Sequence, residues 1–299
     1  MIPAPFEYER PASLDEALLR LAALATDGGT ARPIAGGQSL LPLMKLRLAR
    51  PERLVDIGRF EELRGVRRLG DGRVAIGALT TWSALVDDPD VMAYGLLRDS
   101  IPTIGDVQVR NRGTIGGSLA HADPASDIAA PMLALDAEIV VRSARGSRSI
   151  LATELYLGPF ATTLAPDELI TEIRLPAGSP RFGSAYVALS HPASGYPVAG
   201  VAAVVGRTGE KGAAGGADEP WDVCAVAVTG VGETPYRATA VEAAILDGAP
   251  PLVAAAHITA GQRLLSDPYA DREYRAAMAA VMAARALAAA ADRAVARAV

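Results

Sequence analysis

The chain has 299 residues, of which 50% are hydrophobic and 21% are charged, and its formal net charge at pH 7 is −5. This length suits more than one domain with its own core, and the composition is that of a globular protein. The basic residues are scattered, with the densest cluster at Arg64, Arg67 and Arg68, which argues against a nucleic-acid-binding groove.

Other exclusions follow from rare residues and from the termini. Cys224 is the only cysteine, so an internal disulfide and an iron–sulfur cluster held by this chain alone are excluded. Its neighbours are apolar, which predicts a buried, inert thiol. The three histidines, His121, His191 and His257, lack metal-ligand spacing, and we expect no metal site. The N-terminus lacks a signal-peptide pattern and no apolar run is long enough for a membrane span, so we expect a cytoplasmic protein.

The first part of the chain predicts a small strand–helix–strand unit. Ser13 followed by Glu16 is typical of a helix N-terminus, and leucines at helical spacing continue the helix to a stop at residues 27–29. Strands are expected at 31–35 and 54–57, plausibly parallel, with a helical turn at 40–47 between them. The glycine pattern and acidic residue of a Rossmann unit are missing.

From residue 59 the pattern changes to a lobe of mixed antiparallel strands with a few helices. We expect a hairpin (66–69 and 73–77), short helices (81–85 and 94–100), a strand or turn (108–113), a helix (127–135) and further strands (137–142 and 169–175).

A proline-rich segment at 176–180 marks a boundary before the C-terminal region. Strands are expected at 183–189, 198–205 and 223–229 in one sheet, with a solvated hairpin tip at 206–219. Helices are expected at 238–246, around 254–265 and at 271–297. The sequence thus predicts an α+β protein with a first lobe over 1–58, a second over 59–176 and a sheet-plus-helices domain over 177–299.

Two glycine-rich segments are the best candidates for a ligand site. The first glycine loop, residues 33–40, contains Gly36 and Gly37, and the second glycine loop, residues 114–127, contains Gly116 and Gly117. Consecutive backbone N–H groups in such turns can bind an anion, and more strongly where a helix begins. We expect the helix at 127–135 to place its N-terminus near the second loop. Two such loops suggest a long anionic ligand such as a dinucleotide, although each alone is compatible with a tight turn.

These segments resemble the FAD-binding medium subunit of the molybdenum hydroxylases, the group that includes xanthine dehydrogenase and aerobic carbon monoxide dehydrogenase. The resemblance is carried by four segments in order: 35–42 with 45–47, 112–120 with 122–127, 191–196 and 271–275. It implies a fold of two lobes that bind FAD, followed by a C-terminal domain of three antiparallel strands with helices.

The resemblance also implies which residues bind the cofactor. The diphosphate would be held by backbone amides, and the remaining residues would contact the ribityl chain (Asp127 and Asp123), the adenine (Ile104 and Ile170) and one face of the isoalloxazine (Tyr196). The cofactor-binding residues expected in this way are Ile34, Ala35, Gly36, Gly37, Gln38, Ser39, Leu40, Ile104, Thr114, Ile115, Gly116, Gly117, Ser118, Asp123, Asp127, Ile170 and Tyr196. No catalytic side chain is expected, because the role is electron transfer.

Several positions depart from the family pattern or have simpler interpretations. Many relatives carry lysine near Ala188 and arginine at His191, and Ser118 replaces an asparagine common in eukaryotic members. Asp123 could merely cap the turn before Pro124, Asp127 could be only a helix N-cap, and Tyr196 and His191 could be ordinary turn residues. His121 lies beside the second loop, but the resemblance is to proteins that bind flavin non-covalently.

The implied function is electron transfer through FAD within a larger complex. A large subunit with molybdopterin would oxidise the substrate, and a small subunit with 2Fe-2S clusters would pass electrons to this chain. The external acceptor would be NAD, a quinone or oxygen, and the complex a dimer of heterotrimers. Two alternatives stay open: a self-contained flavin oxidoreductase, and an assembly subunit of the same fold without FAD.

Overall fold

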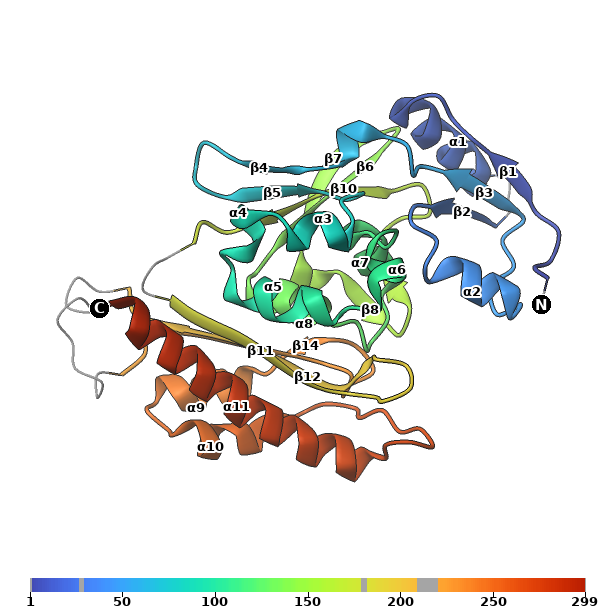
Figure 1. The fold of residues 1–299 in the computed structure, drawn as a ribbon. Coiled ribbons are helices and arrows are strands. Elements are labelled where there is room, and N and C mark those ends of the chain that lie inside the picture. The colour runs from blue at the N-terminus through green and yellow to red at the C-terminus, as the bar shows by residue number, and fades with distance from the viewer. Residues whose placement is uncertain (1, 27–29, 179–181, 209–219, 299) are drawn as a thin grey trace.

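The computed structural model describes residues 2–26, 30–178, 182–208 and 220–298, and its elements are stacked in layers (Figure 1). A five-stranded sheet forms one outer layer, with a group of short helices beneath it. A four-stranded sheet follows, and the long helix α11 (Arg272–Ala298) lies on the far side of that sheet. A three-stranded sheet with α1 (Leu14–Thr26) and α2 (Leu40–Lys45) stands at one side of the stack. The predicted α+β fold is confirmed.

The N-terminal sheet has parallel strands in the order β1-β3-β2. The strands are β1 (Glu7–Glu9), β2 (Ala31–Ile34) and β3 (Arg53–Asp56). Helix α1 begins after Ser13, whose hydroxyl accepts a hydrogen bond from the Glu16 N–H at 3.2 Å. The predicted helix and parallel strand pair are confirmed. Strand β1 was not predicted, because its residues are exposed or half-exposed and show no apolar alternation.

The central sheet is antiparallel, in the order β4-β5-β10-β6-β7. Its strands are β4 (Val66–Arg68), β5 (Val74–Gly77), β6 (Glu138–Ser143), β7 (Gly146–Leu151) and β10 (Leu169–Leu175). A small hairpin of β8 (Tyr156–Gly158) and β9 (Ala161–Thr162) follows β7 in the chain. The helices beneath the sheet are α3 (Trp82–Val86), α4 (Pro89–Met92), α5 (Gly95–Ser100), α6 (Val107–Arg110), α7 (Ile115–His121) and α8 (Ala129–Ala134).

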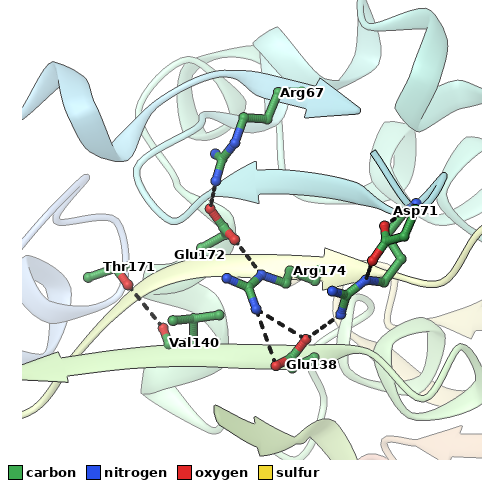
Figure 2. A network of polar contacts seen from close by, with 8 residues as sticks. Arg67, Asp71, Glu138, Val140, Thr171, Glu172 and Arg174 are labelled. Carbon is green, nitrogen blue, oxygen red and sulfur yellow. Dashed lines mark hydrogen bonds and ion pairs between the residues drawn. The ribbon is translucent and has the colours of Figure 1, made fainter. Parts of the chain in front are cut away.

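One face of this sheet packs into the core through Ile76, Ile139 and Ile173, and the other carries charged side chains. Figure 2 shows the charged network, in which Glu172 pairs with Arg67 and with Arg174, the latter at 2.6 Å. Because Arg174 also reaches Glu138 on β6, ion pairs link strands across the sheet. Partly exposed pairs of this kind contribute little stability each.

The C-terminal sheet is antiparallel, in the order β11-β12-β13-β14. Its strands are β11 (Phe182–Ser190), β12 (Pro197–Gly206), β13 (Val223–Thr229) and β14 (Tyr236–Arg237). Helices α5 and α8 contact one side of the sheet, and α9 (Thr239–Leu246) and α11 cover the other, where α10 (Pro251–Ala254) packs on α11. Because both faces are covered, every residue of β12 is buried. The three predicted strands and the predicted last helix are confirmed, and the two-residue β14 is an addition.

Some local expectations are wrong. Residues 108–113 were expected to form a strand or a turn; residues 107–110 form the short helix α6, because Asp106 accepts a hydrogen bond from the Val109 N–H at 2.8 Å, and a turn follows at residues 111–112. The stretch around 254–265 is helical only to His257 and then turns. Most of the expected hairpin tip at 206–219, and the end of the expected boundary at 176–180, lie outside the described residues.

None of the helices in the described ranges combines the length and the apolarity that crossing a membrane requires.

Candidate functional site

The two glycine loops, far apart in the sequence, touch each other in the fold. A Cβ atom added to Gly36 would lie only 1.9 Å from the carbonyl oxygen of Arg112 and 3.1 Å from the Cα atom of Gly113. On the other side of the junction, a Cβ added to Gly117 would lie 3.9 Å from the Cβ atom of Ala35. Glycine is therefore what allows the two backbones to approach this closely.

The first glycine loop offers backbone N–H groups that have no hydrogen-bond acceptor among the described residues. Strand β2 ends at Ile34, Gly37 adopts a left-handed φ of 73°, and α2 begins at Leu40. Within the described ranges no residue accepts a hydrogen bond from the backbone N–H groups of residues 36–40. Residues 34–37, 39 and 40 are half-buried and Gln38 is exposed, so these donors are accessible at the junction. Buried or half-buried amides without partners are uncommon and point to a ligand or to ordered water.

The second glycine loop is arranged differently from our expectation. Its glycine pair begins a helix of its own, α7, and does not lie at the start of the helix expected at 127–135, which begins at Ala129. Thr114 caps α7, since its hydroxyl accepts a hydrogen bond from the Gly117 N–H at 3.2 Å. The short, glycine-rich α7 was missed because it lacks apolar periodicity.

Most amides of the second loop already have acceptors inside the protein. The N–H groups of Ile115 and Gly116 donate to the carbonyls of Thr80 and Ala78 at 3.2 and 2.9 Å, and that of Ser118 donates to Thr114 at 3.0 Å. A Cβ on Gly116 would lie 2.5 Å from the Cβ atom of Ala78, so this glycine serves close packing. The accessible parts of the loop are the exposed Gly117 and the Ser118 hydroxyl, 3.0 Å from that of Ser126.

The two aspartates of the second loop have different surroundings. Asp123 is half-buried and caps its own turn, because its Oδ1 accepts a hydrogen bond from the Ala125 N–H at 2.9 Å. Asp127 is only 7% exposed and accepts a hydrogen bond from the Tyr186 hydroxyl at 2.8 Å. Asp127 is not a helix N-cap, since α8 has Ile128 at that position with no side-chain cap. Burial raises the pKa of Asp127 to about 6, while the bond from Tyr186 favours the charged form.

Tyr196 lies near both aspartates although it comes from the turn before β12. Its side chain is 46% exposed, and its pKa is raised by burial and by the negative charges of Asp123 and Asp127. His191 closes the turn, because its Nδ1 accepts hydrogen bonds from the N–H groups of Ala193 and Ser194 at 3.1 and 3.2 Å. Its ring also packs edge-on against Tyr269. The interpretation of His191 as a turn residue is confirmed.

The apolar candidates belong to the central core. Ile170 in β10 is 6% exposed, and the half-buried Ile104 packs against the same cluster. Ile104 also offers its carbonyl to the Arg110 guanidinium at 3.2 Å. The half-buried Ala188 packs there as well. Contact of Ile104 and Ile170 with an adenine stays a prediction.

Two residues near the site were not selected from the sequence. Tyr186 is a member of an apolar strand and gave no polar signal. Gly200 interrupts the apolar run of β12, and a glycine inside a strand marks the close approach of another group. A Cβ at Gly200 would lie 2.4 Å from the Tyr186 hydroxyl oxygen. The glycine within the apolar run therefore indicates, from the sequence alone, that another group approaches this strand closely.

In the part of the chain that is described, no three His, Cys, Asp or Glu side chains form a group able to hold a metal ion. Cys224 is buried as expected, and burial raises its thiol pKa to about 12, which favours an inert thiol.

The donor set suits a dinucleotide cofactor such as FAD. A row of backbone N–H groups without an acceptor among the described residues, at a glycine-lined junction, matches a diphosphate. The buried carboxylate of Asp127, in the second glycine loop, can accept hydrogen bonds from sugar or ribityl hydroxyls. The exposed tyrosine nearby offers a flat apolar surface with a polar edge. The residues present therefore fit the cofactor.

The comparisons with known proteins agree with this reading. Residues 4–178 match the family model described as the FAD binding domain in molybdopterin dehydrogenase. The chain is 38% identical to the carbon monoxide dehydrogenase medium chain of Afipia carboxidovorans, over 100% of this chain and 99% of that one. It is 39% identical to the glyceraldehyde dehydrogenase medium chain of Sulfolobus acidocaldarius over 81% of each.

A solved structure extends the agreement to the fold. Carbon monoxide dehydrogenase from Hydrogenophaga pseudoflava, in a form that lacks the Mo-pyranopterin moiety of its molybdenum cofactor, matches with a TM-score of 0.89 and 40% identity, over 98% of this chain and 99% of that chain. Because the family model covers more than half of the sequence and a relative matches along the whole of it, the chain belongs to the family of FAD-binding medium subunits of molybdenum hydroxylases, and it is the FAD subunit of a multi-subunit oxidoreductase.

Proposed function

We propose that FAD binds across the junction of the two glycine loops, with its diphosphate on the N–H groups of residues 36–40. The observation that carries this proposal is that these donors have no acceptor among the described residues, at a place where Gly36 contacts Arg112 and Gly113, the two residues before the second loop. The second loop would contribute the surface of Gly117 and the hydroxyl of Ser118, because its other amides are already used.

The remaining cofactor contacts follow from the same placement. Asp127 would accept a hydrogen bond from a ribityl hydroxyl, and Tyr196 would cover one face of the isoalloxazine. This assignment is supported by the proximity of Tyr196 to Asp127. Ile104 and Ile170 would border the adenine. In this arrangement the chain's own groups bind, orient and partly shield the cofactor from water, and no side chain acts as a nucleophile or general base.

The proposed role is to carry electrons between partner subunits and an external acceptor. When bound, FAD accepts and releases one or two electrons. A large subunit with molybdopterin would oxidise the substrate, and a small subunit with 2Fe-2S clusters would deliver the electrons to FAD. NAD, a quinone or oxygen would then receive the electrons. We infer a dimer of heterotrimers, and lobe limits at residues 58 and 176. The relatives are named for carbon monoxide and for glyceraldehyde, so the substrate would be chosen outside this chain.

The experiment is to co-express the chain with candidate iron–sulfur and molybdopterin subunits, purify the assembly through this chain, and measure FAD, iron and molybdenum per chain. About one FAD per chain, with iron and molybdenum in the same fraction, is the expected result. Anaerobic reduction with dithionite, followed by NAD, a quinone or oxygen added separately, then identifies the acceptor from the rate at which the oxidised flavin absorbance returns.

Other outcomes distinguish the alternatives. A complex with iron and molybdenum but no flavin, even after reconstitution with FAD, would make the chain an assembly subunit. Turnover of small molecules by the flavin-loaded chain without partners would favour a self-contained oxidoreductase.

A further inference from the structure

Tyr186 makes a buried polar contact in the candidate site, and it comes from the C-terminal sheet. Its hydroxyl donates to Oδ1 of Asp127 at 2.8 Å, with the two residues 6% and 7% exposed. The hydroxyl occupies space left by Gly200 on the neighbouring strand, where a Cβ would lie 2.4 Å from its oxygen. The contact is therefore built by residues of β11, β12 and the second glycine loop together.

The segment around Asp127 is fixed to the same sheet by its backbone. The carbonyl of Pro124 accepts a hydrogen bond from the Gly230 N–H at 2.8 Å. The hydroxyl oxygen of Thr229, at the end of β13, lies 2.8 Å from the Pro124 carbonyl and 2.9 Å from the Ser126 carbonyl. The backbone at Pro124 and Ser126, just before Asp127, is thus hydrogen-bonded to the end of β13 and to Gly230. The Tyr186 hydroxyl adds the contact that orients the Asp127 carboxylate itself.

We propose that Tyr186 is a positioning residue for FAD: its hydroxyl holds one oxygen of Asp127 so that the carboxylate presents its remaining accepting capacity to the ribityl chain. This inference rests on the proposed function, because it takes the FAD site as given. It makes the C-terminal sheet part of the cofactor site, although Tyr186 itself need not touch the cofactor.

The surroundings of Asp127 support an effect of Tyr186 on its charge. The hydroxyls of Tyr186 and Thr103 favour the charged form, and burial opposes it. Burial and the negative charges of Asp123 and Asp127 raise the pKa of Tyr196, in the turn before β12, so Tyr196 carries no charge at neutral pH. The ion pair of Asp99 with Arg293 contacts the backbone of β11, where Asp99 accepts a hydrogen bond from the Tyr186 N–H at 3.1 Å. This ion pair does not orient the carboxylate of Asp127. Removal of the Tyr186 hydroxyl would therefore raise the pKa of Asp127 further.

The test is a double-mutant cycle on FAD binding to the full chain, purified with its accompanying subunits and stripped of flavin. The variants are Tyr186→Phe, Asp127→Asn and the double variant, and the dissociation constant is measured from quenching of FAD fluorescence. Tyr236→Phe is the matched control, because Tyr236 is another buried tyrosine of this sheet, whose hydroxyl donates to the Ile258 carbonyl at 3.0 Å away from Asp127.

We expect Tyr186→Phe to weaken FAD binding about 10-fold, the factor that a hydrogen bond to a charged group commonly supplies, and Tyr236→Phe to change it less than about twofold. If Tyr186 acts through Asp127, the double variant binds FAD about as weakly as Asp127→Asn alone. In Tyr186→Phe, the loss of affinity on acidification also begins at a higher pH than in the wild type, because Asp127 becomes protonated more readily.

The outcomes separate this inference from the proposed function. Strictly additive losses, or equal losses in Tyr186→Phe and Tyr236→Phe, would overturn the positioning role while leaving the FAD site intact. Failure of the wild-type chain to bind FAD at all would overturn the proposed function instead.

Discussion

At Gly36 the backbone of residues 112 and 113 lies so close that no side chain fits. Replacement of Gly36 by alanine therefore tests the whole candidate site. The added Cβ would lie 1.9 Å from the Arg112 carbonyl oxygen. A contact of about 3 Å is the closest that such atoms tolerate, so the loops must separate by about 1 Å. Binding groups generally need to be held within about 0.5 Å of their working positions. We therefore expect Gly36→Ala to weaken FAD binding about 10- to 100-fold.

The matched control is Gly70→Ala, because a Cβ at Gly70 meets no atom within 4 Å and its φ is not left-handed. FAD dissociation constants of the two variants are compared by fluorescence quenching, and thermal unfolding is followed by circular dichroism. Overpacking commonly costs about 1–3 kcal/mol, so Gly36→Ala should melt a few degrees lower and remain folded. If the FAD dissociation constants of Gly36→Ala and Gly70→Ala agree within about twofold, the junction is not the diphosphate site. The N–H groups of residues 36–40 would then not bind the diphosphate.

Three further predictions concern buried groups of the flavin-free chain. Asp127 has a folded-state pKa of about 6 against an ordinary 3.8, so unfolding releases a proton at pH values between these two. The free energy of unfolding of the wild type should therefore fall relative to that of Asp127→Asn by about 3 kcal/mol as the pH rises from about 4 to 6, and then stay level. A difference between the two proteins that stays constant across this pH range in urea unfolding would contradict the raised pKa. Arg275 is 6% exposed and donates a hydrogen bond to the Val198 carbonyl at 2.9 Å, so Arg275→Leu should lower the free energy of unfolding by about 2–3 kcal/mol. The control Arg285→Leu, at an exposed position of the same helix, should change it by less than about 0.5 kcal/mol. Equal effects of the two substitutions would argue against a stabilising role of the buried contacts of Arg275. The Cys224 thiol, with its pKa raised to about 12 by burial, should react with a disulfide reagent only after the chain is unfolded, and rapid labelling of the folded chain would contradict its burial.

Local sequence signals predicted the elements that depend on local chemistry. The cap at Ser13 and the hairpin across residues 66–77 were confirmed because propensity, capping and turn residues agree with the final packing there. The first glycine loop was also recognisable, because Gly36 and Gly37 follow a short strand and precede a helical turn. In contrast, β1 depends on pairing with β3, and its own residues carry little apolar pattern.

The candidate site was predictable only in part, for a similar reason. Side chains with obvious chemistry, such as Asp127, were selected, but the hydrogen bonds that they form were not. Tyr186 lies in an apolar strand, 59 residues beyond Asp127, and only the fold brings the two together. The use of the second loop's amides also depended on Ala78 and Thr80, which come from a distant part of the chain.

The strand order of the central sheet has a consequence for how the chain is made. Strand β10, the last of the five to be synthesised, lies in the middle, between β5 and β6. Until residue 175 has left the ribosome, the hairpins β4–β5 and β6–β7 each expose an unpaired edge. Such long-range pairing is slow and leaves nascent chains prone to aggregation. The nascent subunit should therefore depend on chaperones most during the interval between the emergence of β5 and that of β10.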